Sequence, residues 1–218
     1  DAAQTVGKMQ IDVAELPIDL LTMTAHKIHG PQGIGAIFAR NAHWLSPVFF
    51  GGPQENNLRP GTENIPGIVG YGKAAEVRTS AMDSVISRLG ELRDCFERRV
   101  LESIPDVAVN GDRTRRTCNT TNLRFNGVDG QALVVGLDSE GIQCSQSSAC
   151  TNSRPEPSYV LRAMNLTEEA AYSSVRFSFG VFNSEDEIEA VVASIDGICK
   201  RLRGFASRIN NPYQVAKA

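Results

Sequence analysis

Two amphipathic segments stand out in the pattern of hydrophobic and polar positions. In the first, hydrophobic residues recur every three or four positions with charges between them, at Val85, Leu89, Leu92, Phe96 and Val100. This spacing predicts a helix over residues 67–104, ended by Pro105. In the second, the hydrophobic face comprises Ile188, Val191, Ile195, Cys199 and Leu202. Residues 184–187, Ser-Glu-Asp-Glu, have the pattern of a capping box and predict where this last helix begins.

Shorter hydrophobic runs predict the other elements. The predicted strands cover residues 18–23, 35–39, 122–125 and 132–137, and short helices are predicted over 157–164 and 167–172. The first two strands are expected to be buried and are separated by a turn-rich stretch, 29–33. The chain is therefore expected to divide into an α/β part, residues 1–84, and a smaller α+β domain, residues 85–218.

Composition and charge argue against several classes of function for this chain. The 22 basic and 25 acidic side chains give a net charge of −3, which argues against nucleic acid as a partner. No run approaches the ~18 consecutive apolar residues of a membrane helix, and no export signal opens the sequence. The five cysteines form no C-x-x-C pair, which argues against a disulfide framework and favours a reducing, cytoplasmic location. Because residue 1 is aspartate rather than methionine, we expect the sequence to be a fragment.

Lys27 is the first candidate nucleophile. The tetrapeptide Thr24-Ala25-His26-Lys27 follows a predicted strand and precedes a Gly-rich turn, so Lys27 is expected at a strand end. Burial there would lower its pKa and make it a nucleophilic amine. An exposed lysine at a turn is the alternative interpretation. His26 and His29 have no carboxylate or third imidazole at ligand spacing, so a metal site is not expected.

Cys150 is the second candidate nucleophile. It lies in a polar run, residues 145–153, where a thiol is exposed and able to react. Cys95 and Cys199 instead fall on hydrophobic helix faces, as structural cysteines do. The pattern assigns Cys118 and Cys144 to neither class.

Several motifs, in order along the chain, resemble the pyridoxal-phosphate-dependent cysteine desulfurases of the NifS/IscS type. They are Asp1-Ala2-Ala3-Gln4, residues 24–31, Arg59-Pro60-Gly61-Thr62-Glu63-Asn64, Ser148-Ala149-Cys150-Thr151, residues 156–162 and residues 174–178. The resemblance implies the α/β fold of PLP-dependent transferases of fold type I. Residues 1–84 would be the C-terminal portion of the cofactor-binding large domain, and residues 85–218 the small domain that carries the cysteine loop.

The resemblance also implies a set of ligands for pyridoxal 5'-phosphate. Lys27 would bind the cofactor aldehyde covalently and later move the proton on the substrate Cα. Asp1 would pair with the pyridine nitrogen, and Gln4 would hydrogen-bond the ring oxygen. Thr24 and His26 would hold the phosphate.

Substrate, assembly and sulfur transfer are implied in the same way. Arg176 would bind the carboxylate of L-cysteine through its planar guanidinium. Cys150 would attack the substrate sulfur, which releases L-alanine and leaves a persulfide for an iron-sulfur scaffold or another acceptor. Thr62 would reach the phosphate in the partner subunit, which implies a homodimer.

The sequence departs from the family in length and in detail. Family members are nearly twice as long, and the part without a counterpart here precedes Asp1. Residues 51–57 replace a stretch that usually has a further Gly and an Arg, and Gln32 stands where a Lys is common. Two alternatives remain open: an inactive fragment that only binds partners, and another fold-type I enzyme such as an aminotransferase or selenocysteine lyase, for which Cys150 would matter less.

Overall fold

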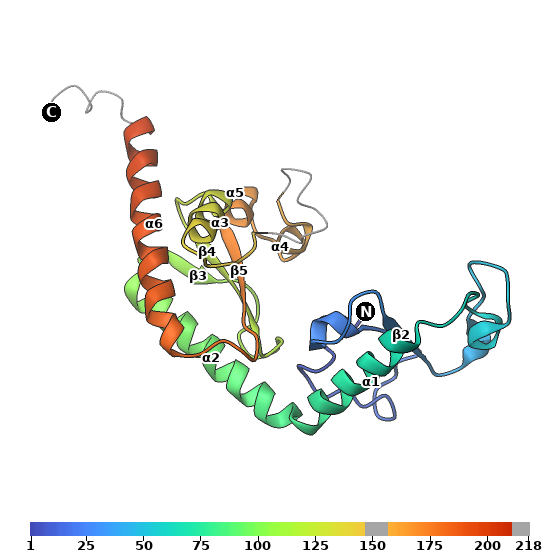
Figure 1. The fold of residues 1–218 in the computed structure, drawn as a ribbon. Coiled ribbons are helices and arrows are strands. Elements are labelled where there is room, and N and C mark those ends of the chain that lie inside the picture. Colours follow the sequence, from blue (N-terminus) through green and yellow to red (C-terminus); the bar gives the residue numbers. More distant parts are fainter. Residues whose placement is uncertain (147–156, 211–218) are drawn as a thin grey trace. The chain divides into compact units, whose positions relative to one another are not determined.

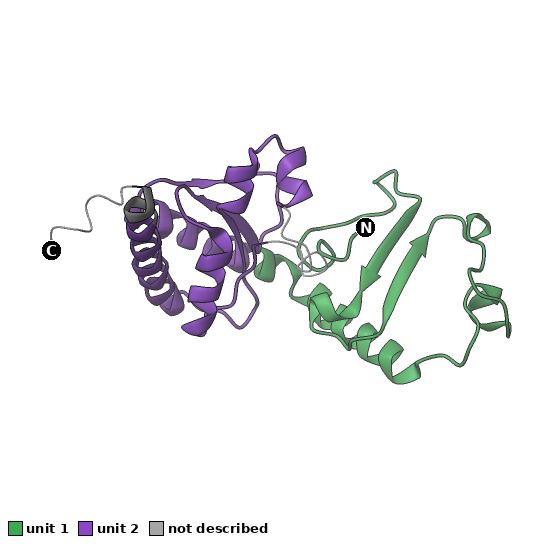
Figure 2. Cartoon of the chain, turned by 90° about the horizontal axis from the view of Figure 1, so that it is seen from above, with its two compact units in different colours: residues 1–86 green, residues 87–218 purple. Residues whose placement is uncertain are grey.

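The computed structural model describes residues 1–146 and 157–210. The chain divides into two compact units, Asp1–Ile86 and Ser87–Ala218 (Figure 2). Both units combine helices with antiparallel strands, so the fold is α/β (Figure 1). Among the described residues, no helix has the length and apolar character needed to cross a membrane.

Unit 1 is built on a two-stranded antiparallel ladder. Strand β1 (Leu20–Thr24) pairs with β2 (Gly35–Ala39), in register from Leu20 opposite Ala39 to Thr24 opposite Gly35. The 3-10 helix η1 (Ala25–Ile28) follows β1 directly. Beyond β2 come the 3-10 helices η2 (Ala42–Trp44) and η3 (Gln54–Asn57), and then helix α1 (Ile65–Ser80).

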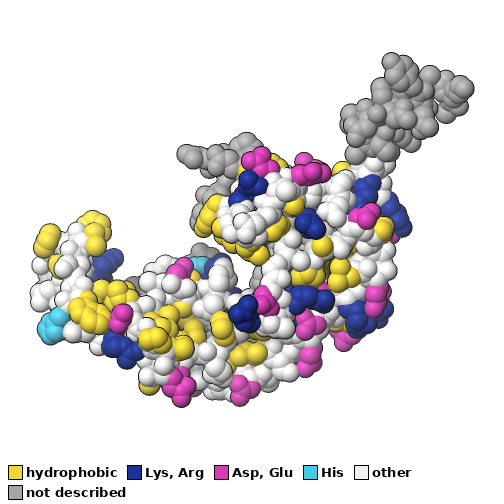
Figure 3. Space-filling model, turned by 180° about the vertical axis from the view of Figure 1, so that it is seen from behind, with side chains coloured by type: hydrophobic (Ala, Val, Ile, Leu, Met, Phe, Trp, Pro, Cys, Tyr) yellow, Lys and Arg dark blue, Asp and Glu magenta, His cyan; other side chains and the backbone are white. Residues whose placement is uncertain are grey.

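The two predicted strands of unit 1 are confirmed, but their predicted burial is wrong. Leu20 is 44% exposed and Ile37 is 50% exposed. Within residues 1–86 no third strand pairs with the ladder, so neither strand is enclosed on both sides. Hydrophobic side chains are also exposed beyond β2, with Phe49 at 69% and Phe50 at 88% (Figure 3). Unit 1 therefore presents apolar surface of the kind that other protein surfaces cover.

Unit 2 contains a three-stranded antiparallel sheet in the order β3-β4-β5. Its strands are β3 (Val107–Val109), β4 (Thr120–Phe125) and β5 (Ser174–Ser178). Alternate residues point to opposite faces, so the buried Leu123 and Val175 share one face. Asn122 and Arg176, which are half-buried, share the other. The predicted strand at 122–125 is confirmed as part of β4.

The hydrophobic core of unit 2 lies between the apolar face of this sheet and three helices. These are α2 (Met82–Ser103), which begins in unit 1, α3 (Gly130–Ser139) and α6 (Asp186–Asn210). Phe96 of α2 packs against Phe177, with ring centroids 4.9 Å apart, and against Phe179 at 5.4 Å. Burial of these aromatic rings packs α2 against the sheet. Helix α2 carries the hydrophobic face of the longest helix that the sequence predicts.

The helix predicted over residues 67–104 is two helices. Helix α1 ends at Ser80, and Ala81 has φ −110° and ψ 10°, outside the helical region. Local side chains compete for the backbone at this point: the Ser80 hydroxyl donates to the Glu76 carbonyl at 2.9 Å, and the Ser84 hydroxyl donates to the Ala81 carbonyl at 2.9 Å. The hydrophobic spacing that predicted the helix resides entirely in α2.

The strand predicted at 132–137 is wrong, because this segment is part of helix α3. The Asp129 carboxylate accepts a hydrogen bond from the Ala132 N–H at 2.9 Å and caps the helix. Leu133 and Leu137, one helical turn apart, are both 0% exposed. A short run of apolar residues fits both the period of a helix and the period of a strand, and here contact with the core favours the helix.

The remaining predicted helices are confirmed. Helix α4 (Tyr159–Ala163) is capped by Ser158, and helix α5 (Glu168–Tyr172) is capped by Thr167, whose hydroxyl accepts from the Ala170 N–H at 3.2 Å. At the start of α6 the Glu187 carboxylate accepts from the Ser184 N–H at 3.1 Å, which is the reciprocal bond of a capping box.

Glu97 on α2 is a buried carboxylate. Its side chain is 0% exposed, and both of its oxygens accept hydrogen bonds from the Arg116 guanidinium, with Nη2 3.0 Å from Oε2. Burial raises the pKa of Glu97, but the hydrogen bonds and charge of Arg116, with the charge of Arg113, outweigh this effect and hold the pKa below its ordinary value. The ionised pair fixes α2 to the segment before β4.

Replacing Glu97 with alanine is expected to lower the free energy of unfolding by about 3 kcal/mol. The reason is that Arg116, only 14% exposed, loses its main partner. The measurement is urea denaturation, with Glu102→Ala on the exposed side of the same helix as the control. The control is expected to change stability by less than about 0.5 kcal/mol, and equal losses in the two variants would contradict the prediction.

The contribution of Glu97 depends on pH with a defined sign. Because its folded pKa lies below the unfolded value of about 4.3, the stabilisation is present above that pH and disappears as the pH falls through the folded pKa. Glu97→Gln should therefore show a smaller acid-induced loss of stability than the unchanged protein.

Candidate active site

Lys27 lies on η1, immediately after β1. Ala25 and Ile28, three positions apart on η1, are 0% and 4% exposed, whereas Lys27 is exposed. The alternative interpretation, an exposed lysine at a turn, is confirmed, and burial of Lys27 is wrong: a 3-10 helix has three residues per turn, so burying Ala25 and Ile28 leaves Lys27 on the outer side. Its amine forms no hydrogen bond or ion pair within residues 1–146 and 157–210.

Two contacts hold this turn at the strand end. The Ala25 N–H donates to the Ile34 carbonyl at 3.2 Å, and the Gly30 N–H donates to the Ala25 carbonyl at 2.9 Å. A Cβ on Gly30 would lie 2.9 Å from the Cβ of Ala25 and 3.2 Å from that of Ala74 on α1. Glycine at position 30 therefore allows α1 to approach η1 closely, which fixes the backbone beneath Lys27.

Thr24 and His26 lie together beside Lys27. The Thr24 Oγ1 and His26 Nδ1 are 2.8 Å apart and share a hydrogen bond. Thr24 is half-buried at the end of β1, and His26 is exposed. A hydroxyl, an imidazole and an amine thus lie within four consecutive residues, and residue types of this kind can donate hydrogen bonds to an anionic group.

Asp1 reaches the same strand from the start of the chain. Its Oδ1 accepts from the Thr22 hydroxyl at 2.9 Å and from the Ala3 N–H at 2.9 Å. Thr22 and Thr24 alternate along β1 and so point to the same face. The structure thereby places the Asp1 carboxylate on the strand that leads to Lys27. Gln4 is exposed, and its Oε1 accepts from the Lys8 amine at 3.3 Å.

Thr62 is not joined to this group. It is exposed in the segment between η3 and α1, where the Gly61 N–H donates to the Gln54 Oε1 at 3.1 Å and Asn64 caps α1. Within residues 1–86, no hydrogen bond links Thr62 to Thr24, His26 or Lys27.

Arg176 belongs to unit 2 and lies on the polar face of β5. A β-bridge joins its backbone to Ser145: the Ser145 N–H donates to the Arg176 carbonyl at 3.1 Å, and the Arg176 N–H donates to the Ser145 carbonyl at 2.6 Å. In the part of the chain that the structure describes, its guanidinium has no hydrogen-bond or ion-pair partner. Arg176 is therefore fixed at its backbone and available at its side chain.

Cys150 lies outside the described residues. The chain leading to it ends its described course at Gln146, whose Nε2 donates to the Tyr172 carbonyl at 2.6 Å. A Cβ on Gly130 would lie 2.5 Å from that carbonyl and 3.0 Å from the Gln146 Nε2, so glycine makes room for this contact. No local sequence pattern marks Gln146, because its partner carbonyl is 26 residues away.

The structure describes four cysteines, Cys95, Cys118, Cys144 and Cys199. Cys199 is 0% exposed, and burial raises its pKa to about 11. Burial, with the nearby charge of Asp138, raises the pKa of Cys144 to about 11 as well. At neutral pH both are therefore protonated and poorly nucleophilic. This environment classifies Cys144, which the sequence pattern left open, as a structural thiol.

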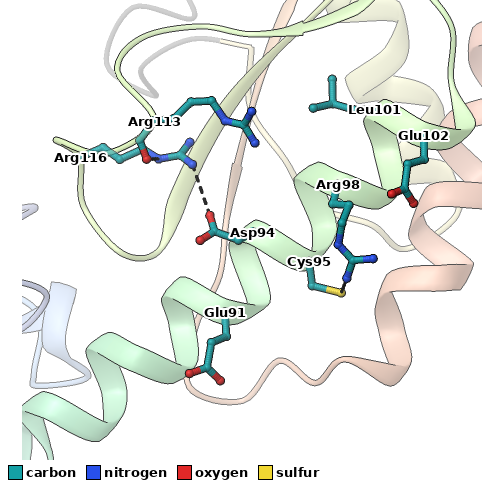
Figure 4. A pocket seen from close by; sticks show the side chains of 8 residues that line it. All are labelled: Glu91, Asp94, Cys95, Arg98, Leu101, Glu102, Arg113 and Arg116. Carbon is teal, nitrogen blue, oxygen red and sulfur yellow. Dashed lines mark hydrogen bonds and ion pairs between the residues drawn. The ribbon is translucent and has the colours of Figure 1, made fainter.

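A cavity of about 690 Å³ in unit 2 is not lined by Arg176, the described candidate residue of that unit (Figure 4). Its lining comprises Glu91, Asp94, Cys95, Arg98, Leu101, Glu102, Arg113 and Arg116. Arg116 is committed to Glu97 and Asp94, 3.3 Å from the latter, and Arg98 donates to the Cys95 Sγ at 3.6 Å. Across the described segments, no group of three or more His, Cys, Asp or Glu could hold a metal ion.

Comparison with known proteins identifies the family. Residues 1–191 match the family described as aminotransferase class-V. The chain belongs to this class of proteins. It is 44% identical over 203 residues to the cysteine desulfurase IscS of Dictyoglomus turgidum, and 44% identical over 206 residues to a cysteine desulfurase of Nostoc sp.. These alignments cover 93% and 94% of this chain and 52% of each relative.

Solved structures give the same result. The fold is similar to that of a NifS-like protein, with a TM-score of 0.82 and 28% identity over 92% of this chain and 52% of that one. A NifS-like protein from Rickettsia africae matches with a TM-score of 0.81 and 31% identity, over 91% of this chain and 52% of that one. The relatives named here are thus cysteine desulfurases and NifS-like proteins, and the chain spans about half the length of each.

The raised pKa of Cys144 predicts slow alkylation. At pH 7.5 Cys144 is expected to react with iodoacetamide at least ~100-fold more slowly than a free thiol of pKa about 8.5, because so little of it is thiolate. Peptide mapping of the alkylated protein across a pH series measures the rate. The urea-unfolded protein is the control and should label at the rate of a free thiol. A labelling midpoint below pH 9 in the folded protein would refute the prediction.

Proposed function

We propose that this chain is part of a pyridoxal-phosphate-dependent cysteine desulfurase that converts L-cysteine to L-alanine and takes up the sulfur on Cys150. Residues 1–84 would be the C-terminal portion of the large, cofactor-binding domain, and residues 85–218 the small domain. The observation that carries the proposal is the end of β1, where Thr24, His26 and Lys27 lie together at the positions of the family motif.

The side chains of unit 1 fit pyridoxal phosphate in their chemistry. The cofactor presents an aldehyde, a phosphate and a ring nitrogen, which require an amine, hydrogen-bond donors and a carboxylate. Lys27 supplies an amine that has no other partner among the described residues, Thr24 and His26 supply the donors, and Asp1 supplies the carboxylate. Gln4 would hydrogen-bond the ring oxygen. The bound cofactor would supply the electron-withdrawing ring that makes the substrate Cα acidic.

Side chains of this protein would carry out the other steps of the reaction. Arg176, whose guanidinium has no partner in the described segments, would bind the substrate carboxylate in a bidentate manner. The Lys27 amine would remove the proton on Cα and return a proton to the product. Both roles follow from the match of these positions to the family motifs.

Cys150 would carry out the sulfur transfer. Its thiolate attacks the substrate sulfur, the carbon–sulfur bond breaks, and its electron pair stays with the carbon skeleton, which gains a proton and leaves as alanine. The sulfur atom remains on Cys150 as a persulfide, ready for an iron-sulfur scaffold or another thiol acceptor. The free thiols of Cys95, Cys144 and Cys199 in the described segments support a reducing compartment such as the cytoplasm, where a persulfide survives.

The decisive experiment compares Lys27→Ala and Cys150→Ala in the intact, cofactor-loaded protein supplied with L-cysteine. Lys27→Ala should abolish both the visible absorption of the bound cofactor and alanine release, because no other lysine takes its place. Cys150→Ala should retain the absorption and lose both alanine release and protein-bound persulfide.

Matched substitutions serve as controls. Lys73→Ala removes an exposed lysine of α1 paired with Glu76, and Cys144→Ala removes a thiol of raised pKa; neither should reduce alanine release more than about twofold. If Cys144→Ala lost activity and Cys150→Ala kept full activity, the assignment of Cys150 as the nucleophile would be wrong. Borohydride reduction that labels a lysine other than Lys27 would overturn the cofactor assignment.

We propose further that the active species is a homodimer in which Thr62 serves the phosphate of the neighbouring subunit. Thr62 is exposed and has no hydrogen bond to the donors beside Lys27 within its own unit, which supports a role across a subunit interface. Co-expressed Lys27→Ala and Thr62→Ala subunits test the idea, because a mixed dimer contains one site with both residues intact. Activity well above that of either single variant is expected, and activity no higher than the average of the two homodimers would refute the shared site.

A further inference from the structure

Asn110 follows β3 and makes hydrogen bonds across the polar face of the sheet in unit 2. Its Nδ2 donates to the Asn122 Oδ1 at 2.6 Å and to the Ser174 Oγ at 2.9 Å. Its backbone N–H donates to the Asn122 carbonyl at 2.9 Å. The Ser174 hydroxyl in turn donates to the Ala170 carbonyl of α5 at 2.6 Å. One side-chain amide thus connects all three strands.

The two acceptors of this amide are the immediate neighbours of Arg176. Asn122 lies directly opposite Arg176 in the register of β4 and β5. Side chains opposite one another in an antiparallel pair have Cβ atoms about 4.5–5.5 Å apart. Ser174 precedes Arg176 by two positions on β5 and points to the same face. The Asn110 amide therefore fixes the side chains that flank Arg176 on two sides.

Arg176 needs such support more than most residues. Its long side chain has many rotamers, and the described part of the chain provides no direct partner for its guanidinium. Ordering a long arginine side chain costs rotamer entropy. Neighbours locked by hydrogen bonds restrict the rotamers open to Arg176 before any ligand arrives.

We propose that Asn110 is a positioning residue for Arg176: by tying Asn122 to Ser174, it holds the guanidinium in the direction from which it binds the substrate carboxylate. The inference rests on the proposed function, in which Arg176 is the carboxylate-binding residue. No local sequence signal marks Asn110, since its partners lie 12 and 64 positions away.

The first test compares Asn110→Ala and Asn110→Asp with Val109→Ala in the intact, cofactor-loaded protein. Aspartate keeps the size of asparagine but removes both donors. Val109 is the preceding residue, at the end of β3, and packs against the hydrophobic core, so its truncation weakens the same strand without touching the polar network. Both Asn110 variants should raise the KM for L-cysteine about tenfold with a smaller change in kcat. Val109→Ala should lower the unfolding midpoint and leave KM within about twofold.

The second test is a double-mutant cycle with Arg176→Ala. If Asn110 acts through Arg176, Asn110→Ala should cost nothing further in kcat/KM once Arg176 is removed. Additive losses in the cycle would overturn the inference, as would an unchanged KM in both Asn110 variants. An unchanged KM in Arg176→Ala alone would instead contradict the carboxylate role of Arg176 in the proposed function, so the two failures are distinguishable.

A measurement without turnover provides a third readout. The heteronuclear NOE of the Arg176 Nε–Hε group reports the picosecond-to-nanosecond mobility of its side chain. We expect it to fall in Asn110→Ala and to match the unchanged protein in Val109→Ala. Equal NOE values in all three proteins would overturn the positioning role, because they would show that Arg176 does not depend on Asn110.

Discussion

The pairing of β4 with β5 is the constraint on which unit 2 depends. Its register, from Thr120 opposite Ser178 to Arg124 opposite Ser174, places every second residue of each strand on the same face. One face supplies the core that α2, α3 and α6 cover, and the other supplies the polar network around Arg176. A shift by one residue would exchange the two faces, so the same pairing determines both stability and the placement of Arg176.

Unit 1 differs from unit 2, because most of its candidate side chains are close together in the sequence. Thr24, His26 and Lys27 follow one another across a strand end and one 3-10 turn. This segment is supported by the pairing of β1 with β2, by the Ala25 N–H to Ile34 carbonyl bond and by the packing of α1 on Gly30. Asp1 joins them through a single hydrogen bond to Thr22. Several large apolar side chains of this unit, among them Phe49 and Phe50, are exposed.

The surroundings of a titratable side chain distinguish groups that serve the fold from groups that are available to a ligand. Glu97 is charged but fully engaged by Arg116, and so it serves the fold. Cys144 and Cys199 are thiols held protonated by burial. By contrast, the Lys27 amine and the Arg176 guanidinium have no partner in the described segments. Availability of the charged group, rather than its presence in the sequence, marks the side chains to which a substrate or cofactor could bind.

The sequence by itself determined the elements whose signals are local: the periodic faces of α2 and α6, the capping residues, and the motifs around Lys27, Thr62 and Arg176. Tertiary structure decided the rest. Core contacts made 132–137 a helix, competing side-chain bonds divided the helix predicted over 67–104, and the turn of η1 exposed Lys27. Asn110 became visible only through strand pairing, because a hydrogen bond between residues 64 positions apart depends on register, which no local pattern encodes.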